Sequence, residues 1–151
     1  MKAVLQRVTH AQVVVEGELI SKIENGFLIL LGVDNTDTKA DADVLSKKIS
    51  GMRVFEDENG KMNLSLGDIS GSVLVISQFT LLADCRKGRR PSFINAGAPD
   101  MANELYEYFC ERIKIDGVND VKKGVFGADM KVSLLNDGPV TILLDSKELL
   151  K

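Results

Sequence analysis

The stretch Ser72-Val73-Leu74-Val75-Ile76, with the following Ser77-Gln78-Phe79-Thr80-Leu81, is the part of the chain around which the predicted sheet is arranged. Its four consecutive apolar residues, Val73 to Ile76, include three that are β-branched, a pattern typical of a strand buried on both faces. Two hydroxyls, an amide and an aromatic ring follow without a turn residue, and Leu81-Leu82-Ala83 predicts that the strand continues. We therefore expect a rigid central strand whose end presents polar groups.

Two interpretations of the hydroxyl groups in this stretch remain open. Ser77 and Thr80 can bind a polar ligand, and the basic loop that follows, from Asp84 to Pro91, favours an anionic one. Buried hydroxyls usually form hydrogen bonds with the backbone, however, so the same two residues can be purely structural.

The composition is that of an ordinary soluble globular protein. The chain has 151 residues, of which 44% are hydrophobic and 27% charged, so we expect one domain over residues 1–151 with a core that needs no disulfides. The net charge of −3 argues against a nucleic-acid surface over the whole chain and leaves local basic patches to bind phosphates. No apolar run approaches the ~20 residues of a membrane-spanning helix.

The first residues and the two cysteines indicate a cytoplasmic location. Lys2 and Arg7 interrupt any apolar run near the N-terminus, so no signal peptide is expected. Cys85 and Cys110 are then expected to be free thiols in a reducing compartment rather than a disulfide.

The remaining sequence predicts strands and helices around the central strand. Apolar patterning predicts further strands at 3–8, 12–15, 18–20, 27–33, 131–135 and 140–144, and a hairpin of 52–55 with 61–64 around Glu58-Asn59-Gly60. Apolar residues at helical spacing predict helices over 37–52 and 99–117, the second beginning at Pro99. The expected fold is α+β: a mostly antiparallel sheet, curled or closed into a barrel, with two external helices.

A second polar stretch, Asn136-Asp137-Gly138-Pro139-Val140-Thr141, lies between the last two predicted strands. It is typical of a hairpin turn, with Pro139 opening the next strand, where its missing N–H is tolerated. Only ~5% of such X-Pro bonds in folded proteins are cis, so the sequence by itself favours a trans bond. A cis bond would turn the neighbouring carbonyls in one fixed direction, from which they could sense the shape of a ligand.

Several common kinds of catalytic site find little support in this sequence. His10 is the only histidine, placed at a predicted strand end, so a Ser-His-Asp or Cys-His hydrolase would need it as the base, and an incidental surface histidine is the favoured interpretation. One histidine and two separated cysteines make a protein metal site improbable. We find no phosphate-binding or dinucleotide-binding glycine motif, and the carboxylates fall mostly in loops and on helix faces.

Taken together, Ser77-Gln78-Phe79-Thr80-Leu81 and Asn136-x-Gly138-Pro139-Val140-Thr141 resemble the two signature motifs of the D-aminoacyl-tRNA deacylases, which cleave D-amino acids from mischarged tRNA. The resemblance extends over the whole chain, and no motif position departs from it. Four further blocks match in the expected order: Arg7-Val8, residues 26–33, Lys87-Gly88-x-Arg90-Pro91-Ser92-Phe93 and Phe126-Gly127-Ala128-Asp129-Met130.

The resemblance implies a homodimer with its active site at the subunit interface and a cis bond between Gly138 and Pro139. The motif of one subunit would enter the pocket of the other, with its carbonyls facing the α-carbon of the substrate. A D-amino acid directs its side chain out of such a pocket, an L-amino acid would collide with the carbonyls, and glycine would pass. Arg7 resembles the residue that braces the inserted motif from beneath.

The chemistry implied is hydrolysis of an ester on the terminal ribose of tRNA, without a metal or cofactor. Backbone N–H groups of Phe79 and Thr80 are the candidate oxyanion donors, and donors of this kind are worth roughly 10²–10³ in rate elsewhere. No side-chain base is evident, and in the family the neighbouring ribose hydroxyl of the tRNA is thought to assist. Thr80 as a covalent nucleophile remains a second possibility, although it has no visible activating base.

The remaining blocks are candidates for contacts with the acylated 3′ end of tRNA. The resemblance implies that Ser77 and Gln78 contact the substrate and that a terminal adenosine is bound by Phe126, Gly127, Ala128 and Met130. Arg86, Lys87, Arg89 and Arg90 form a cluster of four charges in five residues that can hold tRNA phosphates, although such clusters are usually just solvated loops.

Two rival functions follow from the same sequence. The first is the related editing module that is fused to some archaeal threonyl-tRNA synthetases and removes L-serine, which the lack of a synthetase domain in these 151 residues disfavours. The second is a non-catalytic dimeric RNA-binding or interaction module.

Overall fold

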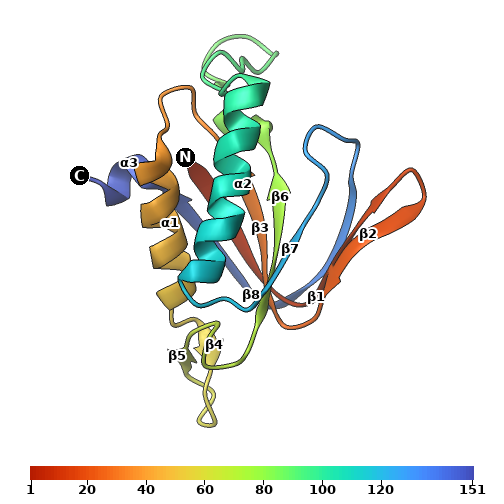
Figure 1. The fold of residues 1–151 in the computed structure, drawn as a ribbon, viewed down its shortest axis with the longest axis vertical. Helices are drawn as coiled ribbons and strands as arrows, with labels where there is room; N and C mark the ends of the chain where they lie inside the picture. Colours follow the sequence, from red (N-terminus) through yellow and green to blue (C-terminus); the bar gives the residue numbers. More distant parts are fainter.

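One curled sheet forms the centre of the molecule in the computed structural model, which describes residues 1–151 (Figure 1). Its strands lie in the order β2 (Glu18–Ile23), β1 (Lys2–Val15), β3 (Gly26–Gly32), β6 (Ser72–Ser77) and β7 (Asp120–Lys123), and β8 (Lys131–Asp145) also pairs with β1. Strand β1 is antiparallel to β2, β3 and β8, whereas β3, β6 and β7 run parallel. The expected curled α+β sheet is confirmed, with a parallel part formed by β3, β6 and β7.

The central strand β6 has the burial that its sequence predicts. Val73, Leu74, Val75 and Ile76 are all buried, because β3 and β7 flank the strand and two hydrophobic clusters cover its faces. Parallel neighbours need long crossover connections, and the segments that join β3 to β6 and β6 to β7 carry the two long helices.

The two expected helices are confirmed, and both pack outside the sheet (Figure 1). Helix α1 (Lys39–Gly51) begins where the Asp41 carboxylate accepts a hydrogen bond from the Thr38 backbone N–H at 2.8 Å, and α2 (Pro99–Ile115) has Pro99 as its first residue. Apolar side chains of both helices join the main core, among them Leu45, Ile49, Leu105, Phe109 and Ile113. A short third helix, α3 (Ser146–Leu149), follows β8 and was not predicted.

Several predicted strand boundaries are wrong. Residues 79–82 form a 3₁₀ turn, η1 (Phe79–Leu82), and do not continue the strand, because the ladder ends with the Gln78 N–H bond to the Leu31 carbonyl. The predicted hairpin at 136–139 is absent, since β8 runs through it along β1 as one strand. Strand β1 likewise joins two predicted strands, and His10 lies exposed within it rather than at a strand end.

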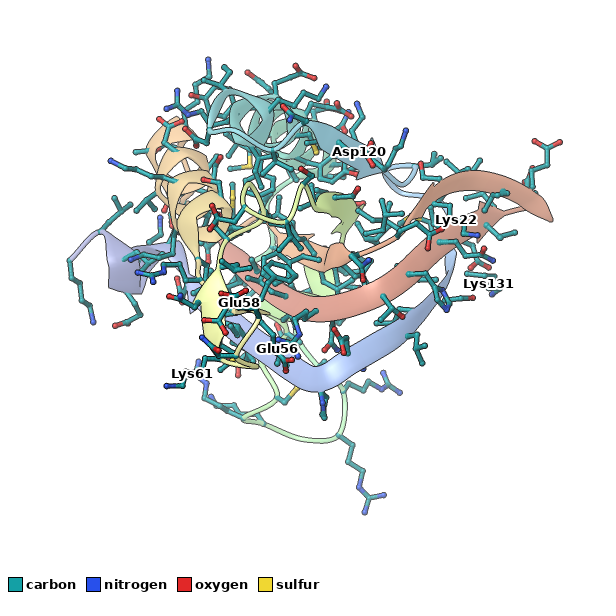
Figure 2. All side chains as sticks on the ribbon, turned by 90° about the horizontal axis from the view of Figure 1, so that it is seen from below. Lys22, Glu56, Glu58, Lys61, Asp120 and Lys131 are labelled. Carbon is teal, nitrogen blue, oxygen red and sulfur yellow. The ribbon has the colours of Figure 1, made fainter.

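The predicted small hairpin is confirmed as β4 (Phe55–Glu56) and β5 (Met62–Leu64). Figure 2 shows Glu56, Glu58 and Lys61 of this hairpin beside the two long, curved strands β1 and β8. Arg7 contacts both Glu56 of the hairpin and Asp137, so the hairpin lies near the segment of β8 that carries the Gly138-Pro139 motif.

Both cysteines are free thiols, as expected, with Cys85 exposed and Cys110 buried. Burial raises the pKa of Cys110 to about 12, so this thiol stays protonated and unreactive at neutral pH. None of the helices is long and apolar enough to cross a membrane.

A buried polar cluster joins the first residue to α1 and α3. The Met1 ammonium donates to Asp37 at 2.6 Å and to the Ser146 hydroxyl at 2.7 Å, and Ser146 in turn donates to Asp41 at 2.6 Å. The Lys147 ammonium lies 2.9 Å from Asp41. Burial alone would raise the pKa of Asp41, but the hydrogen bonds from Ser146, Thr38 and Lys147 outweigh it and lower this pKa below its ordinary value.

Asp41→Asn is expected to lower the free energy of unfolding at pH 7 by roughly 2 kcal/mol, because a buried charged acceptor is lost. The folded-state pKa of Asp41 is depressed, so its stabilisation is present above about pH 4 and is lost as the pH falls. Denaturant unfolding of both proteins should therefore give a difference in unfolding free energy that becomes smaller at acidic pH. Glu58→Gln, on the exposed hairpin, is the control and should leave stability unchanged.

Candidate functional site

A cavity of about 1040 Å³ opens at the end of β6. Its lining includes the first residues of α2 and the loop that joins β7 to β8. Most of its lining residues are hydrophobic, and they come from segments far apart in the sequence. They are Gln6, Leu28, Leu30, Val33, Ile76, Ser77, Gln78, Phe79, Phe93, Ala96, Gly97, Ala98, Pro99, Ala102, Phe126, Gly127, Ala128, Asp129, Met130, Val132 and Leu134.

Two glycines allow the cavity wall to form. A Cβ on Gly32 would lie 2.9 Å from the Gln78 carbonyl oxygen and 2.7 Å from a Leu82 methyl, so only glycine lets η1 fold back against β3. The Gly97 N–H donates to the Val33 carbonyl at 2.8 Å and ties the loop before α2 to the end of β3. These contacts hold η1 and the loop before α2 against the end of β3.

The first predicted motif supplies one side of the cavity through Ser77, Gln78 and Phe79. The Gln78 side-chain amide donates to the Thr80 hydroxyl at 2.5 Å, while Thr80 itself is exposed and does not line the cavity. Phe79 and Thr80 begin η1, where backbone N–H groups have no carbonyl one turn earlier. None of the hydrogen bonds of turns, loops and caps uses either N–H group as donor, so they are available to a ligand oxygen.

The cavity contains no evident catalytic base. Asp129 is the only lining residue with an ionisable side chain, and it forms an ion pair with Lys131 at 3.1 Å. His10 does not line it. The lining therefore offers a reacting group a largely apolar enclosure without a side-chain base.

The segment of residues 126–130 lines another part of the cavity. Phe126 packs on the core, with its ring centroid 5.9 Å from that of Tyr106, whereas Gly127 is exposed with φ +77°. Met130 fills the space beside Gly124, where an added Cβ would lie 2.6 Å from the Met130 sulfur. All four residues predicted from this block, Phe126, Gly127, Ala128 and Met130, line the cavity.

The second predicted motif lies in β8 and bulges out of the sheet. Gln6 pairs with Thr141 and Val8 with Asn136, so the four residues 137–140 of β8 lie opposite Arg7 alone. The Gly138-Pro139 peptide bond is cis, as the resemblance implied, and both residues are exposed. Neither residue lines the cavity.

Arg7 lies beneath this bulge and is 3% exposed. Its Nε donates to the Asp137 carbonyl at 2.9 Å and its Nη1 to the Val54 carbonyl at 2.7 Å. The carboxylates of Glu56 and Asp137 each approach the guanidinium to 3.7 Å. Arg7 therefore ties the bulge to the β4–β5 hairpin.

The predicted cationic cluster lies in the loop between η1 and α2. Asp84 and Ser92 exchange backbone hydrogen bonds at 2.8 and 2.9 Å, which closes the loop. The side chain and backbone N–H of Arg86 lower the pKa of Asp84 to about 2, and the two residues form an ion pair at 2.6 Å. One of the four predicted charges is thus already paired, which leaves three exposed cations without a carboxylate partner: Lys87, Arg89 and Arg90.

Sequence reasoning missed several lining residues. Gln6 was available as the polar member of an apolar strand, and its amide oxygen accepts a hydrogen bond from Thr141 at 2.5 Å. Phe93 was recognised only as part of a matching block. Leu134 was expected to be a strand residue and no more, and nothing in the local sequence marks the loop of residues 96–98 as a cavity wall.

The fold and the cavity define the class as an α+β protein with a curled sheet and a largely apolar cavity at the end of a central strand. The family described as D-Tyr-tRNA(Tyr) deacylase matches residues 4–145. This chain belongs to that family.

Similar proteins cover nearly the whole chain. It is 57% identical over 148 residues to a D-aminoacyl-tRNA deacylase of Thermosipho africanus, with 98% of this chain and 99% of that protein covered. A D-aminoacyl-tRNA deacylase of Phocaeicola vulgatus is 55% identical, with 97% of this chain and 98% of that protein covered. A solved structure titled c-Myc DNA Unwinding Element Binding Protein has a TM-score of 0.90 and 44% identity, and covers 96% of this chain and 98% of its own.

Proposed function

We propose that this protein hydrolyses the ester bond of D-aminoacyl-tRNA and releases the free D-amino acid and tRNA. The observation that carries the proposal is the largely apolar cavity at the end of β6, which is lined by Ser77, Gln78 and Phe79 and has no side-chain base. Such a site suits an ester, which is already activated relative to an amide, so that water needs orientation and a donor for the developing oxyanion.

The direct test compares D-Tyr-tRNA, L-Tyr-tRNA, Gly-tRNA and L-Ser-tRNA as substrates of the purified protein. We expect deacylation of the D-ester at least a hundredfold faster than that of the L-ester, with some activity on the glycyl ester. A preference for an L-seryl ester would instead support the threonyl-tRNA synthetase type of editing module.

Chiral selection is attributed to the backbone of residues 137–140 from a second subunit. The bulge is exposed on its own chain, and Leu135 and Leu143 on either side of it are large apolar residues that also face outward on β8. Exposed apolar residues that flank a protruding segment favour association with another protein surface. A second copy that docks β8 would bring Gly138 and Pro139 to the open cavity.

Leu143→Asp is expected to weaken the dimer by at least tenfold, because a charge would replace an apolar side chain in the interface. Sedimentation should show monomers at concentrations where the unchanged protein is dimeric, and deacylation should fall on dilution. Ile115→Asp is a matched control, since Ile115 is 73% exposed at the end of α2 and Leu143 is 74% exposed on β8. Equal dimerisation of both variants would contradict the proposed interface.

The proposed chemistry uses water, the backbone N–H groups of Phe79 and Thr80, and the ribose hydroxyl next to the ester. The developing oxyanion is held by the two N–H groups. The adjacent ribose hydroxyl assists the attacking water and so takes the role of the missing side-chain base. Thr80 contributes its backbone, and its hydroxyl accepts a hydrogen bond from Gln78.

Thr80→Ala is therefore expected to retain deacylation of D-Tyr-tRNA within about tenfold of the unchanged protein, because a backbone donor survives the substitution. Single-turnover rates measure the effect without interference from product release. A folded, tRNA-binding Thr80→Ala protein with no activity would restore Thr80 as a nucleophile.

The acylated 3′ end of tRNA is proposed to bind with its adenosine against residues 126–130. Lys87, Arg89 and Arg90 lie on the loop beyond η1 and are free to contact phosphates, which makes affinity fall steeply with salt. The substrate places this activity in the cytoplasm, and the proposed mechanism needs no cofactor.

A second candidate function is nucleic-acid binding without catalysis. It is favoured by one observation, the 44% identity to a structure whose title describes a DNA-binding protein. Turnover of D-aminoacyl-tRNA by the purified protein would refute it, and tight binding of single-stranded DNA without turnover would support it.

A further inference from the structure

Two exposed aromatic rings stand at the edge of the cavity, and packing of the core does not explain them. The rings of Phe79 and Phe93 meet edge to face with centroids 5.0 Å apart, and they remain 57% and 37% exposed. Both line the cavity, Phe79 from η1 and Phe93 from the loop before α2. Aromatic rings exposed to this degree beside a cavity offer a flat apolar face to a ligand.

The position of Phe93 in the chain connects this aromatic pair with the basic loop. Phe93 directly follows Ser92, whose backbone pairs with Asp84 and closes the loop that carries Lys87, Arg89 and Arg90. One short segment therefore presents a ring at the cavity and cations just beyond it. A single strand of nucleic acid has the same order, a base and then a phosphate, and proteins that bind it combine aromatic platforms with positive charge.

We propose that Phe93, supported by Phe79, stacks on the base of the nucleotide that precedes the terminal adenosine of tRNA. This inference rests on the proposed function, in which the terminal nucleoside and its amino acid occupy the cavity. The polynucleotide then leaves the cavity past the aromatic pair and reaches the basic loop. Stacking on one ring does not depend on the base, which suits an enzyme that acts on many tRNAs.

Substrates of increasing length test this placement. The D-tyrosyl esters of adenosine, of the dinucleotide CpA and of tRNA add first the preceding base and then the rest of the acceptor end. For Phe93→Ala we expect kcat/KM to fall roughly tenfold for the dinucleotide ester and for D-Tyr-tRNA, which is the loss expected when one base no longer stacks on one ring. For the nucleoside ester kcat/KM should stay within twofold of the value for the unchanged protein. The loss should appear mainly in KM.

Three variants separate stacking from simple packing. Phe93→Trp keeps an aromatic face and should retain the rates of the unchanged protein. Phe93→Leu keeps an apolar side chain against Phe79 but has no ring, so its kcat/KM should fall as much as that of Phe93→Ala. Ile94→Ala removes the exposed neighbouring side chain and should have no effect. Equal losses on the nucleoside and the dinucleotide, or full activity of Phe93→Leu, would overturn the inference.

A binding measurement decides the question independently of hydrolysis. The probe is an unacylated trinucleotide with the fluorescent base 2-aminopurine in the penultimate position. Its fluorescence should be quenched when it binds the unchanged protein and much less when it binds Phe93→Ala. A protein that hydrolyses none of the three esters would refute the proposed function, and the fluorescence would still support or overturn the stacking. Equal quenching by both proteins would overturn it.

Discussion

Gly138→Ala is expected to lower kcat/KM for D-Tyr-tRNA by about a hundredfold or more while the protein stays folded, since a misplacement of about 1 Å at a reacting centre can have this effect. Gly138 has φ +127°, a conformation that L side chains rarely adopt. An added Cβ would also lie 2.9 Å from Nη2 of Arg7 and 3.1 Å from a Val140 methyl. Because Arg7 is held by two carbonyls, the bulge must move instead.

Gly17→Ala is the matched control for this prediction. Gly17 also has a positive φ, +80°, but an added Cβ there meets nothing within 4 Å, and Gly17 is not a lining residue of the cavity. It should lose some stability and keep full activity. Deacylation by Gly138→Ala within threefold of the unchanged protein would show that the bulge does not position the substrate.

Mixed dimers test whether the bulge acts on the partner's cavity. Ala128→Trp would fill the cavity and leave the bulge intact, whereas Gly138→Ala damages the bulge and leaves the cavity intact. If the motif acts across the interface, an equal mixture of the two inactive proteins should regain about a quarter of the normal activity, because half of the dimers hold one complete site. No recovery would place the motif in its own subunit's site.

The sequence predicted the elements whose burial is decided by local periodicity. Strands β3 and β6 and helices α1 and α2 carry continuous or regularly spaced apolar residues, and all four are present. Strand β7 was missed, because Asp120-Val121-Lys122-Lys123 has only one apolar residue and its pairing depends on β6. A strand that is stabilised by pairing with a distant segment need not have a recognisable pattern of apolar residues in its own sequence.

The wrong boundaries have the same origin. Leu81 and Leu82 are compatible with a strand and with a helical turn, and a short apolar run cannot separate the two. Turn residues at 136–139 predicted a hairpin, yet β1 pairs with β8 on both sides of them and absorbs them as a bulge.

The candidate site was found through its motifs, while its assembly needed the structure. Ser77 to Phe79 and Phe126 to Met130 were predicted from the sequence, and both segments line the cavity. Phe93 could not be recognised as part of the wall, because its contact with Phe79 joins a loop to a turn. The contact between Arg7 and Asp137 spans 130 positions and has no local pattern.

Arg7→Ala is expected to reduce both stability and activity. Removing the guanidinium leaves the Val54 and Asp137 carbonyls without their donor, and a lost charged hydrogen bond of this kind costs about 2–3 kcal/mol of unfolding free energy. The bulge loses its support from the β4–β5 hairpin, so kcat/KM for D-Tyr-tRNA should fall about a hundredfold. Arg7→Lys should be intermediate, because an ammonium is a point charge that lacks the planar fork with which Arg7 reaches both carbonyls.

A core variant separates a positioning role of Arg7 from general destabilisation. Val13→Ala, fully buried in the smaller hydrophobic cluster, should cost a similar free energy of about 2 kcal/mol without touching the bulge. Denaturant unfolding gives the free energy of unfolding of both variants. Their kcat and KM are measured under conditions in which both proteins remain folded. If Arg7 positions the bulge, Arg7→Ala loses discrimination between D- and L-Tyr-tRNA and Val13→Ala keeps it, since a folded subunit with an intact bulge still presents the same carbonyls. Equal discrimination in the two variants would reduce Arg7 to a residue that only stabilises the fold.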